Sequence, residues 1–436
     1  MRMDRRGFAG LAAGMVGALA LTPGEAARRA AEGPIRQDLE PPCEELPAPI
    51  AALKPMTEGI RPITDDERHQ RIARAQELMN QQGIGGIVIE PGSSLYYFTG
   101  MRWGLSERPF VGVIPAKGDL AWVCPAFEEE RARELIRFGN DVRTWEEDAS
   151  PYRVIAGILR DRGAGTGKIG VEERVRFFVM DGVRQEMPGA TFVSGTPISA
   201  GCRMYKSQAE IALMQRANDI TVAGMKAAFA TLKEGMTPRE FGNNAEAAFQ
   251  KLGGTSTWAL VGFGEYTAFP HGSIHPQQLK EGDVVLLDAG CAVQNYQSDI
   301  TRTTVFGKPT ARQTQIWNLE RKAQDAAFAA ARLGAPCGSV DDAARKVITD
   351  AGFGPDYKVP GLPHRTGHGI GLDGHEWTNF VRGNNTKLAP GMCFSDEPTI
   401  AIYGEFGIRL EDCLHMTEQG PKFFSEQAPA VDRPFA

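Results

Sequence analysis

The chain has 436 residues, with 48 Lys and Arg against 54 Asp and Glu, so its formal net charge is only −6. A charge this close to balance gives no indication of a nucleic-acid, membrane-surface or polyanion partner. Hydrophobic residues make up 42% and charged residues 23%, which excludes a wholly disordered or fibrous protein. The length favours two domains or one large one. The seven cysteines contain no CxxC pair, so the sequence gives no indication of a zinc ribbon.

The first residues resemble an export signal. A paired arginine in Arg5-Arg6-Gly7-Phe8 precedes an apolar run from Ala9 to Leu21, which is too short to span a bilayer. Small residues then suggest a cleavage site, and the order is typical of a twin-arginine signal, which exports folded proteins. We therefore expect residues 1–27 to be a twin-arginine-type signal peptide and the mature protein to be periplasmic, without membrane contact. A short N-terminal membrane anchor or a chance basic start is the alternative.

Two domains are expected after a linker. Residues 28–62 are rich in Pro, Ala and Glu, which favours a poorly ordered linker. Helix and strand patterns alternate beyond it, which predicts an N-terminal α/β domain over 63–200. Its expected elements are a capped helix from Thr64 that ends near Gly83, a buried strand over 84–89, and a hairpin of 111–115 with 120–124.

The remainder, 201–436, contains a repeated pattern. A helical stretch begins near Ser207, and Thr237-Pro238-Arg239-Glu240 opens the next helix with an N-cap, a first-turn proline and a capping-box glutamate. The Ala-Ala-Phe of 227–229 recurs at 326–328 and again leads into a helix. Two similar halves would place a shared site between them, although Ala-rich helices can also resemble each other by coincidence.

Two aspartates follow strand-like sequence in the first half of this region. Asp288 ends the buried run 284–287, and Asp299 comes eleven residues later. Two strands joined by a short turn would bring the two carboxylates side by side. Taken singly, an aspartate at a strand end is more often a turn or cap residue than a ligand.

Histidines and glutamates cluster in the second half. His364, His368 and His375 fall within twelve residues, and their glycine-rich spacing without an HExxH motif argues against a helical zinc site. Glu397 and Glu411 lie in or beside apolar strands, where an unpaired carboxylate is costly and metal coordination would remove that cost. An oxygen-rich set suited to two divalent ions, and hence to hydrolytic chemistry, would consist of Asp288, Asp299, His368, Glu397 and Glu411.

The order Asp-x10-Asp, His, Glu, Glu, with HRTGHGIG followed by His-Glu, resembles the pita-bread metallopeptidases, specifically their aminopeptidase P/prolidase branch. The resemblance covers 63–425 and is strongest over 270–415. It implies an α/β (α+β) fold, with a creatinase/prolidase-like N-terminal domain and a C-terminal pita-bread domain of two pseudo-symmetric halves. Members cleave the Xaa-Pro bond, so short proline-containing peptides are the implied substrates and a homodimer or higher homo-oligomer is the implied assembly.

Carried over by position, the resemblance implies a dinuclear site held by these five side chains, with Asp299 and Glu411 bridging the ions. Manganese is expected, and cobalt, zinc or iron are alternatives. Glu397 would also carry the proton to the leaving nitrogen. Three residues match the family's non-ligand histidines, which hold substrate and stabilise the tetrahedral intermediate: His271, His364 and His375. Arg409 matches the family's arginine that supports the metal ligands.

The sequence departs from the family pattern near the site. Thr399 and Ala401 replace the glycine and tyrosine that often follow the first glutamate, and Trp377 stands where proline is common nearby. We expect Ala401 and Trp377 to lie where substrate contacts would be. Three aromatic residues of the N-terminal domain could line the far end of the cleft: Tyr96, Tyr97 and Trp103. For Tyr96 and Tyr97 the hydrophobic core is the favoured interpretation.

Three hypotheses follow. An exported, metal-dependent Xaa-Pro aminopeptidase or dipeptidase is favoured. A creatinase-like hydrolase or a metal-dependent lyase on the same fold is the alternative, but creatinase-like members lose the metal ligands and all five are present here. A binding module without activity is the third, and an exported protein would have no chromatin to bind.

Overall fold

The computed structural model describes residues 45–436. The predicted signal peptide and the linker up to residue 44 therefore lie outside the described residues. The rest of the predicted linker differs from expectation, because it contains helix α2 (Ala48–Ala51). Ile50 in this helix is fully buried against Ala227 and Ala248, so one apolar side chain fixes a segment whose composition alone suggested disorder.

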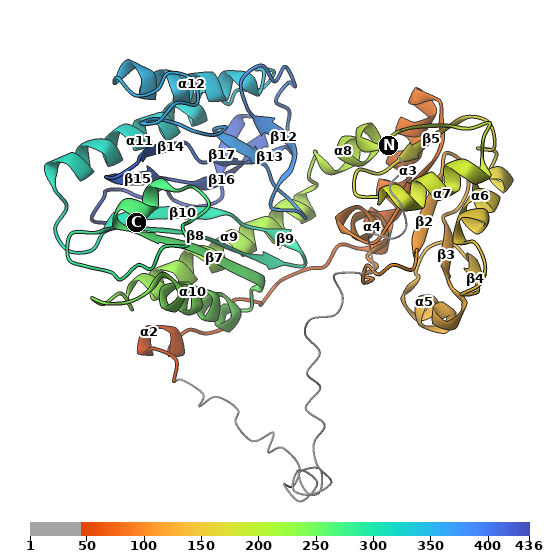
Figure 1. Ribbon diagram of the computed structural model, residues 1–436, viewed down its shortest axis with the longest axis horizontal. Helices are drawn as coiled ribbons and strands as arrows, with labels where there is room; N and C mark the ends of the chain where they lie inside the picture. Colours follow the sequence, from red (N-terminus) through yellow and green to blue (C-terminus); the bar gives the residue numbers. More distant parts are fainter. Residues whose placement is uncertain (1–44) are drawn as a thin grey trace, which may run out of the picture. The chain divides into compact units, whose positions relative to one another are not determined.

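The N-terminal domain is built on a six-stranded mixed sheet of order β4-β3-β2-β1-β5-β6 (Figure 1). Strands β1, β2 and β3 pair antiparallel, and the other neighbours are parallel, with helices on the sheet faces. The strands are β1 (Ile84–Ile89), β2 (Val111–Pro115), β3 (Ala121–Pro125), β4 (Asp141–Trp145), β5 (Lys168–Val171) and β6 (Thr191–Ser194). The helices are α3 (Asp65–Gln82), α4 (Ser93–Thr99), α5 (Glu129–Leu135), α6 (Pro151–Asp161), α7 (Phe177–Glu186) and α8 (Thr196–Arg203), with a 3-10 turn η1 (Ala126–Glu128).

The C-terminal domain consists of two similar halves, each a helix pair followed by an antiparallel sheet. The first half contains α9 (Gln208–Phe229), α10 (Pro238–Leu252), β7 (Thr255–Phe263), η2 (Gly264–Ala268), β8 (Val284–Val293), β9 (Tyr296–Gln297) and β10 (Ile300–Val305). The second contains α11 (Ala311–Ala330), α12 (Gly338–Asp350), β11 (Gly367–Gly369), β12 (Glu376–Phe380), β13 (Cys393–Asp396), β14 (Thr399–Ile402), β15 (Phe406–Arg409), β16 (Asp412–Thr417) and β17 (Gly420–Phe423). The strands lie between the two helix pairs (Figure 1), and the arrangement confirms the repeat.

One contact joins the two halves at the centre of the domain. Thr301 of β10 pairs with Glu411, which lies directly before β16, as an isolated β-bridge. The Glu411 amide donates to the Thr301 carbonyl at 3.2 Å. This bridge brings the Glu411 carboxylate against β10, the strand that follows Asp299.

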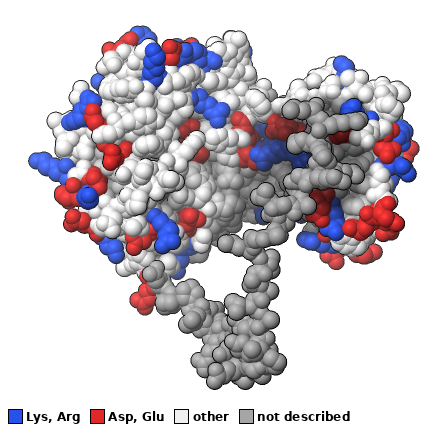
Figure 2. Space-filling model, viewed as in Figure 1, with Lys and Arg blue, Asp and Glu red and all other residues white. Residues whose placement is uncertain are grey.

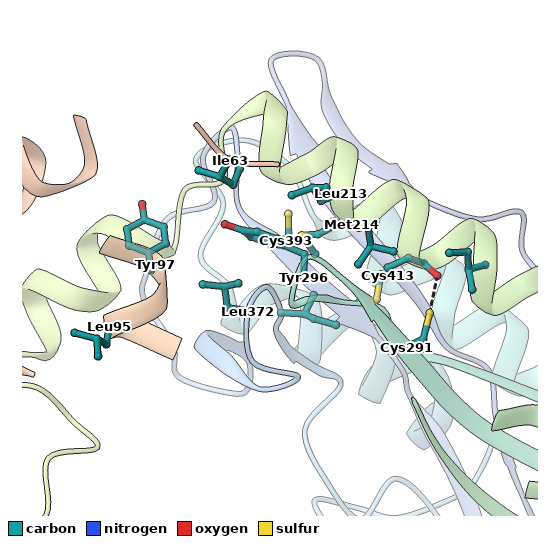
Figure 3. Close-up of a cluster of buried hydrophobic side chains, with 14 of the residues drawn as sticks. Ile63, Leu95, Tyr97, Leu213, Met214, Cys291, Tyr296, Leu372, Cys393 and Cys413 are labelled. Carbon is teal, nitrogen blue, oxygen red and sulfur yellow. Dashed lines mark hydrogen bonds between the residues drawn. The ribbon is translucent and has the colours of Figure 1, made fainter. Parts of the chain in front are cut away.

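A shared apolar core extends from the N-terminal domain into the first helices and strands of the C-terminal domain (Figure 3). Tyr97 belongs to this core and donates its hydroxyl to the Cys202 carbonyl at 3.1 Å, so the core interpretation holds for it. Tyr96 and Trp103 are partly buried against the same core and also line a cavity of about 280 Å³.

Charged side chains are mixed over the surface. On the face shown in Figure 2, Lys and Arg are interspersed with Asp and Glu, in keeping with the near-balanced composition. Within residues 45–436, every helix is too short or too polar to cross a membrane.

Candidate active site

Two adjacent strands of the first half present the two aspartates. Asp288 lies in β8 and pairs in register with Thr301 of β10, while Asp299 immediately precedes β10. The side chains are nearly buried, at 14% exposure for Asp288 and 9% for Asp299. Both aspartates line the same cavity, as expected for two carboxylates that serve one site.

The second half supplies an imidazole and two carboxylates to the same place. His368 lies in β11, and its Nε2 atom is 3.2 Å from Glu397 Oε1 and 3.7 Å from Asp299 Oδ2. Ligand atoms of Asp299, His368 and Glu411 all lie within 4.8 Å of one another. Residues from both halves thus converge on one point, as the repeat predicted.

This donor set fits a divalent metal centre. Burial and the neighbouring carboxylates raise the pKa of Asp299 and of Glu411, so holding these groups as anions requires a compensating cation. Asp288 Oδ1 is buried and has no hydrogen-bond partner among the described residues, as expected for a metal-ligating oxygen. Carboxylate oxygens with one imidazole suit manganese, cobalt, iron or zinc.

Arg409 and Thr301 hold the carboxylates in place. The Arg409 guanidinium pairs with Asp288 and donates from Nε to Thr301 Oγ1 at 2.9 Å. Thr301 Oγ1 in turn donates to Glu411 Oε2 at 2.6 Å. Sequence reasoning missed Thr301, because a threonine hydroxyl gives no motif signal before the register of β10 against β8 is known.

Ser395 is a second residue that sequence reasoning missed. Its hydroxyl donates to Glu397 Oε1 at 3.2 Å and accepts the His368 amide at 3.0 Å. Burial would raise the pKa of Glu397, but the hydrogen bond from His368 and the nearby positive charges outweigh it and lower that pKa. Glu397 is therefore held as a carboxylate.

The non-ligand histidines surround the donor set. The His375 ring stacks on His368 with centroids 3.8 Å apart, and Arg365 Nη2 lies 2.9 Å from His375 Nδ1. Partial burial, reinforced by the neighbouring His368 and Arg365 side chains, lowers the pKa of His375 to about 4. His364 Nε2 lies 3.0 Å from Thr399 Oγ1, and burial lowers its pKa too.

A single cavity of about 1070 Å³ contains the whole constellation. It is large enough for a small peptide. All nine candidate residues line it: His271, Asp288, Asp299, His364, His368, His375, Glu397, Arg409 and Glu411.

The expectation for Ala401 and Trp377 is wrong. Ala401 is fully buried in β14, and Trp377 lines a different, smaller cavity, where its indole donates to Glu173 Oε2 at 2.6 Å. Side chains that do line the catalytic cavity include Trp258, Phe269 and Tyr357. Trp258 and Phe269 lie far from the HRTGHGIG motif in sequence and Tyr357 lies seven residues before it, and none of the three belongs to the motif itself.

The fold and the donor set place the chain in the class of metal-dependent hydrolases with a pita-bread domain. Residues 212–418 match metallopeptidase family M24, and residues 71–205 match the Creatinase/Prolidase N-terminal domain. The chain belongs to family M24 and is a metallopeptidase of its aminopeptidase P/prolidase branch.

Relatives from distant organisms share most of the chain. An uncharacterised peptidase of Schizosaccharomyces pombe is 36% identical over 83% of this chain and 82% of its own length. An Xaa-Pro dipeptidase of Lactobacillus delbrueckii subsp. lactis is 30% identical over 81% of this chain and 95% of its own. The crystal structure of a recombinant prolidase from Thermococcus sibiricus superposes with a TM-score of 0.76 at 28% identity, covering 84% of this chain and 98% of that one.

Proposed function

We propose that the protein hydrolyses the Xaa-Pro bond at the N-terminus of short peptides, with two divalent ions, manganese foremost, at the acidic donor set. The observation that carries the proposal is the convergence of that buried set and three further histidines on one cavity. The names of the Lactobacillus and Thermococcus relatives support proline as the second substrate residue.

The metal ions, when bound, supply Lewis acidity and lower the pKa of water. Glu397 faces the cavity as a carboxylate, so it can accept the proton of the attacking water and pass it to the proline nitrogen. Arg365 donates to His375 Nδ1, which leaves the proton of the neutral imidazole on Nε2. That N–H is a donor for the charge that develops on the carbonyl oxygen.

His364 plays a complementary part. Its Nδ1 atom lies 2.7 Å from the Arg365 carbonyl, which fixes the proton on Nδ1 and leaves Nε2 to accept the Thr399 hydroxyl. A hydrogen-bonded ring of this kind keeps one orientation at the wall of the cavity. Because both ring nitrogens are engaged, we propose that His364 contacts the substrate through the face of its ring while Glu397 moves the proton.

The test is digestion of a peptide panel by the protein lacking residues 1–27, followed by mass spectrometry. The panel contains Xaa-Pro, Xaa-Pro-Yaa and matched Xaa-Ala peptides, with added Mn²⁺, with added Co²⁺ and with chelator. Metal-dependent release of the first residue only before proline is expected, and the ratio of dipeptide to tripeptide cleavage separates dipeptidase from aminopeptidase. A metal-loaded protein that cleaves none of them would favour the lyase or creatinase-like alternative.

Two further features stay proposals. A homodimer or higher homo-oligomer is proposed from the resemblance, and sedimentation of the purified protein measures it. Export through the twin-arginine route is proposed from the paired arginine of residues 5 and 6.

A further inference from the structure

His375 lies in an irregular loop, residues 370–375, between β11 and β12. Leu372 anchors one end of this loop in the shared core (Figure 3). The imidazole must nevertheless keep its stacked position on His368 without help from a helix or strand. The side-chain contacts of the loop therefore decide where the imidazole lies.

Glu376 closes the loop on itself. Its Oε1 atom accepts the amides of Leu372 at 2.8 Å and of Asp373 at 3.1 Å. The same carboxylate accepts Arg203 Nη2 at 2.5 Å and Lys206 Nζ at 3.0 Å. The Arg203, Lys206 and Glu376 side chains are 6%, 2% and 5% exposed, so the cluster is shielded from water.

Asp373 ties the same loop to the N-terminal domain. It accepts Ser93 Oγ of α4 at 2.5 Å and Arg203 Nη2 of α8 at 2.6 Å, and Arg174 Nη2 lies 3.0 Å away. Arg203 thus bridges the two carboxylates that flank His375. Two helices and one turn of the N-terminal domain therefore contact the loop that carries His375.

These charges do more than add stability. Burial alone would raise the pKa of Glu376, but Lys206 and Arg203 outweigh it and lower the pKa to about 2. The carboxylate is therefore ionised at any working pH. Apolar residues often stabilise a buried position as well as an ion pair does. What an ion pair adds here is a fixed geometry of the side chains that it joins.

We propose that Arg203 and Glu376 are positioning residues for His375, and that through them the N-terminal domain sets the orientation of the catalytic imidazole. The proposal rests on the proposed function, because it concerns how His375 serves that reaction. A displacement of about 1 Å at a reacting group can cost about 100-fold in rate. Loss of the anchor therefore lowers kcat more than it changes KM.

The experiment measures kcat and KM on an Xaa-Pro-Yaa peptide with the Mn²⁺-loaded protein. Arg203→Ala and Glu376→Gln are expected to lower kcat about 10- to 100-fold, with KM changed by less than about threefold. Arg203→Lys recovers only part of the loss, because one ammonium cannot hold two carboxylates as a guanidinium does.

Arg71→Ala is the matched control. Arg71 of α3 pairs with Glu210 of α9 at 3.4 Å, with exposures of 7% and 3%, and so links the same two domains without a hydrogen bond to residues 370–375. It should lose folding stability but keep kcat per metal-loaded chain. An equal fall in kcat for Arg71→Ala would overturn the proposal, because general domain docking would then explain the effect.

A double-mutant cycle tests whether Arg203 acts through the imidazole. In a His375→Ala background, adding Arg203→Ala should lower the residual kcat by less than about threefold. Losses that multiply in full would show that Arg203 acts elsewhere.

Hydrogen exchange gives a readout that needs no activity. Peptides covering Leu372 and Asp373 should exchange faster in Arg203→Ala than in the wild type or in Arg71→Ala, at equal metal content. Unchanged exchange overturns the anchor even if Xaa-Pro peptides are cleaved. Faster exchange in a protein that cleaves none of them overturns the proposed function and leaves the anchor intact.

Discussion

At the scale of single residues, metal binding and transition-state stabilisation can be separated. Asp299→Ala removes a donor that lies against both His368 and Glu411, so we expect metal content to fall and turnover to drop more than about 1000-fold. His375→Ala should keep the metal and lower kcat about 100- to 1000-fold, because only a hydrogen-bond donor is lost. Metal per chain by mass spectrometry, beside kcat, distinguishes the two.

Asp356→Ala serves as the control for that pair, since this aspartate is 62% exposed and pairs with Arg382. It should keep both metal and turnover. Unchanged turnover in Asp299→Ala would contradict the two-metal assignment.

The sequence located the site residues more completely than their supports. All nine candidate residues line one cavity. They could be found from the sequence because metal ligands are of few residue types and recur at a fixed motif spacing. The role of each residue stays a prediction. Thr301 and Ser395 escaped, because a hydroxyl carries no such signal until strand register is known. Trp377 was predicted to lie at the substrate site because the direction of its side chain also depends on strand register, which the sequence does not show.

At the scale of elements, helix α11 carries a buried acid with no counter-charge in contact. Glu320 is fully buried, and neither carboxylate oxygen has a hydrogen-bond partner within residues 45–436. Burial raises its pKa well above the usual range. A carboxyl of this kind binds a proton more readily in the folded chain, so its contribution is favourable at low pH and is lost as pH rises through the folded pKa.

Glu320→Gln should therefore increase the free energy of unfolding by about 1–3 kcal/mol at pH 8, and by less at pH 5. Urea unfolding at the two pH values measures the difference. The exposed Glu234→Gln should change stability by less than about 0.5 kcal/mol. A Glu320→Gln protein that is less stable than the wild type at pH 8 would show that the carboxylate has a stabilising partner.

Elements with local signals were predicted well. The helices α3 and α10 begin at capping boxes on Thr64 and Thr237 and end at left-handed Gly83 and Gly253, all of which short sequence windows contain. Helix α2 was missed, because its formation depends on Ile50 reaching an apolar surface contributed by residues distant in the sequence.

At the scale of the whole molecule, metal should stabilise the fold as well as serve the reaction. Added Mn²⁺ binds the folded chain and should raise Tm, whereas chelator should lower it. Without metal, the raised pKa values of Asp299 and Glu411 make stability fall as pH rises through them, so the gain from Mn²⁺ should be larger at pH 8 than at pH 5.5. Calorimetry checks this, and Asp299→Ala should show no such gain.

The bridge between Thr301 and Glu411 joins positions that are 110 residues apart. Between them, the exposed turn around Lys308 links β10 to α11 and contributes nothing to the cavity. A protease that nicked the backbone there would leave both pieces held together by backbone pairing and packing. Covalent continuity at this turn is therefore dispensable for the finished site, although the intact chain is what first brings its two halves together.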